Sequence, residues 1–180
     1  MSQIPAIRLR PATVDDIAQL SAWDTDDDVV AATTDAPDAE LAFEGLDWHE
    51  ELAGQTEHYR YYIAELEGRP LGAMLVIDPH LEHTHYWGHI EPGLRALDIW
   101  IGAPADRGQG SGTAMMTHAI DMCFSEPDVT AIVIDPLASN TRAHAFYRRL
   151  GFTEEGRRMF DDSDCLVFRL TRNAWTARQA

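Results

Sequence analysis

Cysteine is scarce in this sequence. Only Cys123 and Cys165 occur among the 180 residues, and neither has a partner at the spacing of metal ligands. This excludes a framework of several disulfides and a cysteine-based zinc site. We expect both thiols to be reduced and structural, Cys123 in a helix and Cys165 in a strand.

Positive charge is also scarce. The chain carries 14 Lys and Arg residues against 30 Asp and Glu residues, which gives a formal net charge of -16 at pH 7. Such a charge repels nucleic-acid phosphates and anionic lipid surfaces, so we expect neither as a partner. The same charge concentrates cations near the protein, although acidity can also serve solubility alone.

Long apolar runs are absent. No window approaches the roughly 18 consecutive apolar residues that a membrane-spanning helix needs. Residues 1–10 lack the basic, then apolar, then small-residue order of an export signal. With 45% hydrophobic and 24% charged residues, the composition is that of a globular protein. We expect one soluble domain over residues 1–180, located in the cytoplasm.

The first third of the chain predicts a strand and two helices. Residues 7–10 alternate as in a short strand, and Thr13 precedes acids that suit the first turn of a helix. The acidic residues 24–28 interrupt that helix, and a second helix is expected over residues 38–53. The expected core positions of these two helices are Val14, Ile17, Leu20, Leu41, Leu46 and Leu52.

Alternating apolar residues predict the central sheet. Residues 59–66 and 70–77 form an expected hairpin around a Glu-Gly-Arg turn. Residues 80–93 follow without a regular pattern. Residues 94–101 are the next strand, in which the side chain of Asp98 faces away from those of its apolar neighbours.

A glycine-rich loop follows this strand. It reads Arg-Gly-Gln-Gly-Ser-Gly over residues 107–112 and leads into a helical run over residues 113–124. Glycines let the backbone approach a ligand, and the unpaired amides at a helix start attract an anion, so the loop predicts a pyrophosphate site. A P-loop would need a lysine, and a dinucleotide fingerprint would have glycine in place of Thr113, so neither fits.

The last third of the chain alternates strand and helix. Residues 129–134 form a nearly uninterrupted apolar run, as expected of a strand covered on both faces. A helix over residues 139–150 has a Ser or Asn cap and ends before Gly151. Phe152 and residues 165–170 supply the final strands, which we expect to be another hairpin.

The glycine loop is similar to the acyl-coenzyme A loop of the GNAT acetyltransferase superfamily, in which Arg or Gln precedes two spaced small residues. Arg107, Gly110 and Gly112 meet this pattern. Residues 139–143 and 146–152 resemble the second coenzyme-contacting segment of that family. The resemblance implies an α+β GNAT fold in three layers. Its central mixed, mostly antiparallel sheet has six to seven strands, is splayed between the fourth and fifth strands, and is flanked by about four helices.

A longer resemblance, over roughly residues 58–176, is to bacterial aminoglycoside 6'-N-acetyltransferases. It is carried by segments such as residues 91–98 and 171–175, whereas the tract of residues 83–89 differs. In that family two aspartates, on the fourth strand and at the end of the fifth, line the pocket for the polycationic aminoglycoside. The substrate-side residues implied in this chain are Asp98, Asp135, Glu91, Trp87, Asp162 and Trp23. Trp87 and Tyr86 could stack on sugar rings or simply cover the sheet.

The resemblance also implies catalytic roles and a co-substrate, acetyl-CoA. Asp98 would accept the proton of the acceptor amine, directly or through water. Asp135 would anchor ammonium groups of the acceptor, and Tyr147 would donate a proton to the coenzyme sulfur. The residues implied to contact acetyl-CoA are Ile99, Trp100, Ile101, Arg107, Gly108, Gln109, Gly110, Ser111, Gly112, Thr113, Asn140, Ala143 and Tyr147.

Other interpretations stay open at this point. Four histidines in residues 80–89 could form a metal site, but the glycine and aromatics around them favour a substrate-side loop, and we expect no metal. The acceptor could instead be a lysine-like or siderophore amine or a protein amine, because all GNAT proteins share the coenzyme motifs. A non-enzymatic acetyl-CoA sensor is a further class. The sequence is equally consistent with a monomer and a homodimer.

Overall fold

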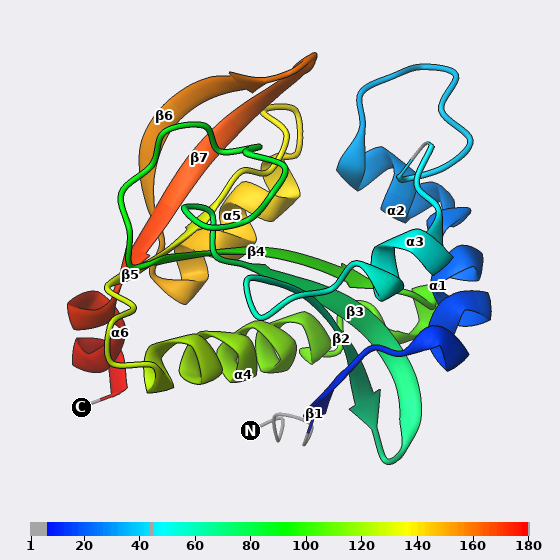
Figure 1. Ribbon diagram of the computed structural model, residues 1–180, viewed down its shortest axis with the longest axis horizontal. Helices are drawn as coiled ribbons and strands as arrows, with labels where there is room; N and C mark the ends of the chain where they lie inside the picture. The colour runs from blue at the N-terminus through cyan, green and yellow to red at the C-terminus, as the bar shows by residue number, and fades with distance from the viewer. Residues whose placement is uncertain (1–6, 44, 180) are drawn as a thin grey trace.

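A single mixed sheet organises the computed structural model, which describes residues 7–43 and 45–179 (Figure 1). The strand order is β1-β2-β3-β4-β5-β7-β6, and only β4 and β5 are parallel neighbours. The strands are β1 (Ile7–Pro11), β2 (Tyr59–Leu66), β3 (Arg69–Ile77), β4 (Leu94–Ile101), β5 (Ala131–Ile134), β6 (Thr153–Phe160) and β7 (Ser163–Thr171). The expected mixed, mostly antiparallel sheet is confirmed.

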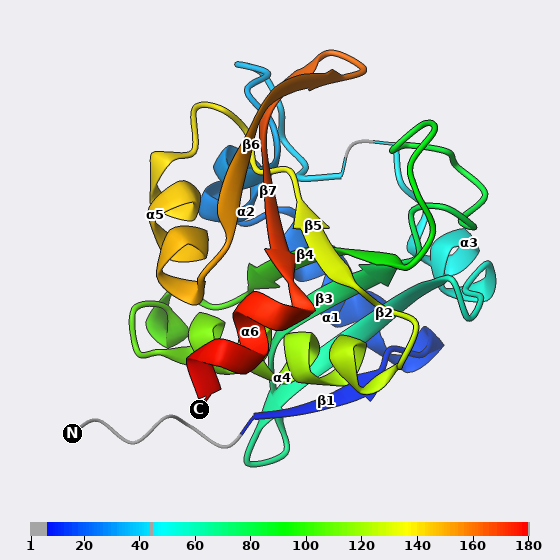
Figure 2. The ribbon, with the colours of Figure 1, turned by 90° about the vertical axis from the view of Figure 1, so that its left-hand side faces the viewer.

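Helices cover both faces of this sheet and make three layers (Figures 1 and 2). The α-helices are α1 (Ile17–Asp24), α2 (Asp27–Thr33), α3 (Trp48–Ala53), α4 (Ser111–Ser125), α5 (Thr141–Leu150) and α6 (Arg172–Gln179), with short 3-10 helices η1 (Val14–Asp16) and η2 (Pro104–Asp106). Helices α1 to α3 bury Leu20 and Trp48 on one face. Helices α4 to α6 bury Met115, Leu150 and Trp175 on the other.

The sheet opens between its fourth and fifth strands. β4 and β5 pair only through Leu94, Arg95 and Ala96, whose partners are Ala131, Ile132 and Val133. β4 continues for five residues beyond this ladder, whereas β5 ends at Ile134. The parallel strands therefore separate, as the resemblance implied, and a gap in the backbone ladder lies where the two strands would next have paired.

Strand positions were predicted well, and the reason is visible in their burial. β5 is apolar and buried at each of its four positions, and β4 extends over the expected residues 94–101. The C-terminal hairpin of β6 and β7 is also confirmed. Helix α5 is capped by the Asn140 side chain and ends at Gly151, whose φ of 97° is a left-handed conformation that suits glycine.

The predicted helix over residues 38–53 is wrong for most of its length. Only Trp48–Ala53 is helical, because the Asp47 side chain accepts hydrogen bonds from the amides of His49 and Glu50 and starts the helix there. Leu41 and Leu46 lie in the preceding loop, and residue 44 lies outside the described residues.

Two helices were not predicted. The Asp26 side chain caps α2 within the acidic stretch that was interpreted as an interruption, and α6 follows β7 directly. Helix α4 also begins two residues before the expected start, at Ser111. The described residues thus hold six α-helices rather than about four.

Both cysteines are free and buried, as expected. Burial raises the pKa of each thiol to about 12, so both are protonated at neutral pH. Among the described residues, none of the helices has the length and apolar character required to span a bilayer. Residues 1–6, part of the segment that lacks an export pattern, lie outside the described residues.

Candidate functional site

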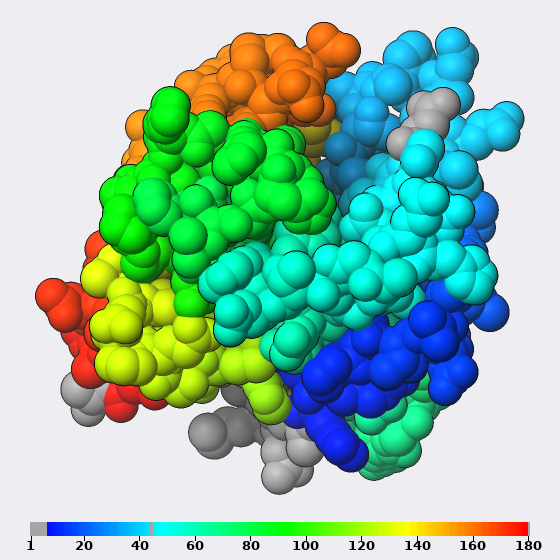
Figure 3. Space-filling view, in the orientation of Figure 1, coloured from blue at the N-terminus to red at the C-terminus, as the bar shows by residue number. Residues whose placement is uncertain are grey.

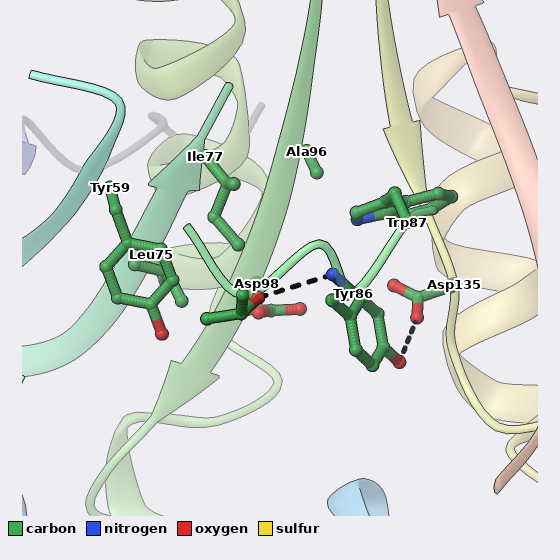
Figure 4. Close-up of a pocket in the computed structure, with 9 residues that line it drawn as sticks. Tyr59, Leu75, Ile77, Tyr86, Trp87, Ala96, Asp98 and Asp135 are labelled. Carbon is green, nitrogen blue, oxygen red and sulfur yellow. Dashed lines mark hydrogen bonds between the residues drawn. The ribbon is translucent and has the colours of Figure 1, made fainter. Parts of the chain in front are cut away.

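A pocket of about 170 Å³ lies beside the gap between β4 and β5 (Figure 4). Its walls combine one face of strands β2 to β4, the start of the chain after β5, and the loop of residues 80–93. It is lined by Tyr59, Leu75, Ile77, Thr84, Tyr86, Trp87, Ala96, Asp98 and Asp135. In the space-filling view this loop lies against the β6–β7 hairpin, and a hollow separates them from the residues that follow α2 (Figure 3). The pocket is mainly aromatic and aliphatic, with two carboxylates.

The sheet itself brings the two carboxylates together. Ala96 of β4 and Val133 of β5 are the last paired residues, and both point into the core on the face of α1 to α3. Asp98 and Asp135 each lie two residues further along, so strand alternation directs both side chains to that face. They would be neighbours in a continued ladder, and the separation of the strands leaves them at the edge of an open space.

The surroundings of these two carboxylates raise their pKa values. For Asp98 the cause is loss of hydration among the protein atoms around the pocket, although its side chain still contacts pocket solvent. For Asp135 the largest cause is again burial, followed by the negative charge of Asp98. A hydrogen bond from Tyr86 acts in the opposite direction on Asp135. The two acids therefore titrate as an interacting pair above the ordinary carboxyl range.

Tyr147 lies on helix α5, next to Phe152 and Phe168 in the core on the opposite face. It is 8% exposed, and its hydroxyl makes no hydrogen bond within the described part of the chain. Burial, followed by the negative charges of Asp98 and Asp135, raises the pKa of this phenol, which is therefore protonated at neutral pH. A protonated hydroxyl without a protein acceptor is available to donate to a ligand.

The glycine loop has the backbone shape that an anion site requires. Gly108 and Gly110 have φ values of 74° and 86°, and Gly110 is the N-cap of helix α4. The first amides of α4 follow at Ser111. These amides, at the positive end of a 15-residue helix, can hold a pyrophosphate. Residues 99–101 of β4 pair with β3 on one edge but lie beyond the pairing with β5 on the other, and that edge offers backbone groups for an extended ligand.

Several predicted coenzyme residues also have contacts within the protein. The Arg107 guanidinium pairs with Asp26 and Asp28 and donates to the carbonyls of Ile101 and Gly102. Its side chain is 13% exposed. The Asn140 side chain caps α5 by accepting from the Ala143 amide, Gln109 donates to Ala105, and Trp100 is buried among aromatics. Coenzyme contact by these side chains remains a prediction.

Three predicted substrate residues lie outside the pocket. Trp23 is 6% exposed and packs against Gly102, where even a methyl side chain would collide with the indole ring. Glu91 forms an ion pair with Arg169, which holds the pKa of the Glu91 carboxyl below its usual range. Asp162 is exposed at the turn between β6 and β7. Only Trp87, 2% exposed, joins the two aspartates in the pocket wall.

The pocket also contains residues that were not predicted as site residues. Leu75 and Ile77 could have been found, because they pair with Asp98 and Ala96 across β3 and β4 and so share their face. Tyr59 follows from the same alternation on β2. Thr84 had no such signal, since it belongs to an irregular loop, and Tyr86 was considered only as an aromatic that could stack on a sugar ring or cover the sheet. Within the described residues, no group of three or more His, Cys, Asp or Glu side chains could hold a metal ion.

The pocket, the glycine loop and the gap in the sheet all lie in a region whose sequence matches a known family. A family model described as an acetyltransferase (GNAT) domain matches residues 12–160. The chain belongs to the GNAT acetyltransferase family. The match spans all the pocket residues, the coenzyme-type loop and helix α5, so the GNAT fold and the resemblance that implied it are confirmed.

Curated relatives of this GNAT chain include an aminoglycoside acetyltransferase and a kanamycin resistance protein. Aminoglycoside N(6')-acetyltransferase type 1 from Klebsiella pneumoniae is 30% identical over 115 residues, 63% of this chain and 57% of that protein. A kanamycin resistance protein from Rhizobium radiobacter is 31% identical over 96 residues, 53% of this chain and 89% of that protein. The chain thus aligns with little more than half of the length of the first relative.

Solved acetyltransferase structures align over more of the chain. Aminoglycoside acetyltransferase AAC(6')-Ib in complex with coenzyme A has a TM-score of 0.82 at 27% identity, over 97% of this chain and 100% of that one. The same protein with coenzyme A and kanamycin gives 0.81 at 27% identity, with the same coverage. A spermidine N-acetyltransferase from Vibrio cholerae, at 18% identity and a TM-score of 0.72, shares the fold.

Proposed function

We propose that this protein is an acetyl-CoA-dependent N-acetyltransferase that acts on the 6'-amino group of aminoglycoside antibiotics and confers resistance to them. The observation that carries the proposal is the placement of Asp98 and Asp135 together in an aromatic pocket at the gap between β4 and β5. A pocket with two acids suits a small, multiply charged amine better than a peptide. The named relatives and structural neighbours support the same acceptor class.

The coenzyme would enter from the opposite side of the gap. The amides of the glycine loop and of the start of α4 would hold its pyrophosphate, and the edge of β4 that faces away from β3 would pair with its pantetheine arm beyond the ladder to β5. The thioester would then lie where β4 and β5 separate. A neighbouring structure in complex with coenzyme A supports the use of this coenzyme.

Transfer would be direct, within a complex of both substrates. The neutral amine nitrogen attacks the thioester carbonyl, a C–N bond forms, and the C–S bond breaks. Asp98 takes the proton lost by the amine, directly or through water, and Tyr147 donates a proton to the leaving thiolate. Asp135 holds an ammonium group of the acceptor in place.

The raised pKa of Asp98 matters for this step. A carboxylate beside an ammonium group stabilises the charged amine and so opposes its deprotonation. A carboxylate whose pKa is raised toward neutrality is a stronger base than an ordinary one, which partly offsets that effect. The pKa of Asp135 is raised as well, so the choice of Asp98 as the proton acceptor rests on the family resemblance, while the hydrogen bond from Tyr86 favours Asp135 as the binding group.

Thiol release from acetyl-CoA by the purified protein tests this proposal. We expect turnover with aminoglycosides that bear a 6'-amine and none with matched analogues that bear a 6'-hydroxyl. The chain contains no lysine, so acetylation of its own lysine side chains cannot contribute a background. If no aminoglycoside stimulates release while acetyl-CoA still binds, the acceptor assignment fails. Lysine-like amines, protein amines and a sensor role would then be tested in turn.

A further inference from the structure

Tyr86 occupies a special position in the pocket. Its hydroxyl donates a hydrogen bond of 2.7 Å to Asp135 Oδ2, and the two residues are 49 positions apart in the sequence (Figure 4). Among the described residues, no other side chain makes a hydrogen bond to the Asp135 carboxylate. The position of that carboxylate therefore depends on a residue from the irregular loop.

Two sets of contacts hold the Tyr86 ring in place. The ring stacks on Phe160 of β6, with ring centres 4.7 Å apart and an angle of 12° between the planes. The Arg158 guanidinium in turn lies over the Phe160 ring, 4.5 Å from its centre. Arg158 also donates a hydrogen bond of 2.8 Å to the Trp87 carbonyl. Loop and hairpin are thus joined beside the pocket.

The backbone amide of Tyr86 donates a hydrogen bond to the side chain of Glu82. This carboxylate is 2% exposed and accepts from the amides of Thr84 at 2.5 Å and Tyr86 at 3.0 Å. A buried carboxylate that satisfies loop amides in this way fixes the loop conformation. The hydroxyl of Tyr86 is therefore presented to Asp135 by an ordered support and not by chance contact.

We propose that Tyr86 is a positioning residue that orients Asp135 to receive a second ammonium group of the acceptor, and so sets a preference for acceptors with two neighbouring amines. This inference rests on the proposed function. Asp98 serves the reacting amine, and Asp135 accepts from Tyr86 through Oδ2, which leaves Oδ1 for the second ammonium. The phenol supplies direction without adding charge, so the carboxylate keeps its attraction for a cation.

The test compares Tyr86→Phe with the wild type on two aminoglycosides that share the 6'-amine. One bears a second amine on the same ring, and the other bears a hydroxyl at that position. We expect Tyr86→Phe to raise the KM for the diamine about tenfold, as expected for loss of one hydrogen bond to a charged group. The KM for the hydroxyl congener should change by less than about threefold and kcat by less than about twofold, because the ring and its stacking remain.

Two control variants distinguish the loss of the Tyr86 hydroxyl from other effects of substitution. Tyr62→Phe removes a hydroxyl outside the pocket and should leave both KM values as in the wild type. Tyr86→Leu removes the stacking as well and should raise both KM values. Equal KM changes for the two congeners in Tyr86→Phe would overturn the inference, since a merely structural role would not distinguish them.

A second readout does not require turnover. The pKa of Asp135, followed by carboxyl carbon NMR and assigned with Asp135→Asn, should rise in Tyr86→Phe, because the ionised form loses a hydrogen bond. Asp98, Arg158 and Cys165 also face this carboxylate and are unchanged by the substitution. If the wild type does not acetylate aminoglycosides, the proposed function and the acceptor preference fail together, and this titration still tests separately whether Tyr86 positions the Asp135 carboxylate. An unchanged Asp135 titration would then reject that positioning role.

Discussion

Asp98 is the residue on which the proposed chemistry depends most. Replacing it with Asn keeps the shape and removes the proton acceptor, so we expect kcat to fall roughly 100-fold or more. Steady-state thiol-release kinetics measure the change. Asp128→Asn, at an exposed position outside the pocket, is the matched control and should retain wild-type kinetics. A kcat for Asp98→Asn within threefold of the wild type would remove Asp98 from the mechanism.

The pair of acids gives the activity a specific pH dependence. Asp98 must be ionised to accept a proton, and its pKa is raised, so kcat/KM should increase with pH through a range above the ordinary carboxyl pKa of about 4. Asp135→Asn removes a neighbouring negative charge and should move this acidic limb to lower pH. A limb that stays in place in Asp135→Asn would show that the two carboxylates do not interact.

Tyr147 should affect the chemical step and not the fold. Its hydroxyl has no hydrogen-bond partner in the described chain, so Tyr147→Phe should change the free energy of unfolding by no more than about 0.5 kcal/mol. We expect kcat to fall about 100-fold while the KM for acetyl-CoA changes little, since general acid catalysis is lost. Urea unfolding and initial rates measure both quantities. A destabilised variant with normal kcat would indicate a packing role.

Sequence and structure differ most at single residues of irregular segments. The direction of Asp98 follows from strand alternation, and its partners Leu75 and Ile77 follow once the register is known. The position of Tyr86 does not follow from the sequence, because its loop has no regular apolar pattern and its partner Asp135 is distant in the chain. Local patterns therefore predict which face a strand residue occupies but not which loop residue meets it.

At the scale of elements, Arg107 links the coenzyme-type loop to helix α2. It pairs with Asp26, which caps that helix, and with Asp28 in its first turn. We expect Arg107→Gln to lower the free energy of unfolding by about 2 kcal/mol, because it leaves mostly buried acceptors without their donor. Asp28→Asn, at an exposed carboxylate, should cost no more than about 0.5 kcal/mol.

The same substitution distinguishes two roles of Arg107. Because the guanidinium supports the loop, Arg107→Gln should raise the KM for acetyl-CoA more than the KM for the acceptor. Denaturant unfolding and two-substrate kinetics are the measurements. If Arg107→Gln is as stable as the wild type and only the coenzyme KM rises, the side chain contacts the coenzyme directly, as the family resemblance first suggested.

Elements were predictable where burial imposes a pattern. The strands of the sheet alternate or are wholly apolar, and their positions were found from the sequence. Residues 38–47 contain Leu41 and Leu46, which were interpreted as core positions of a helix, yet the Asp47 cap starts the helix only at Trp48. A side-chain hydrogen bond to the backbone decides the helix start here, and apolar spacing alone does not reveal it.

At the scale of the whole molecule, the net charge of -16 should influence the two substrates in opposite ways. An acidic protein attracts a polycationic acceptor and repels anionic acetyl-CoA, and salt screens both effects. Between about 0.01 and 0.2 M salt, we expect the KM for the acceptor to rise several-fold and the KM for acetyl-CoA to fall or stay constant. A parallel rise of both values would show that the global field does not act on binding.

The position of the transferred acetyl group tests the central claim most directly. Kanamycin is incubated with acetyl-CoA and the purified protein, and the acetylated nitrogen of the product is identified by two-dimensional NMR. We predict a single acetyl group on the 6'-nitrogen, formed by the wild type and scarcely by Asp98→Asn. Acetylation at another nitrogen, or no product from a protein that binds acetyl-CoA, would contradict the account.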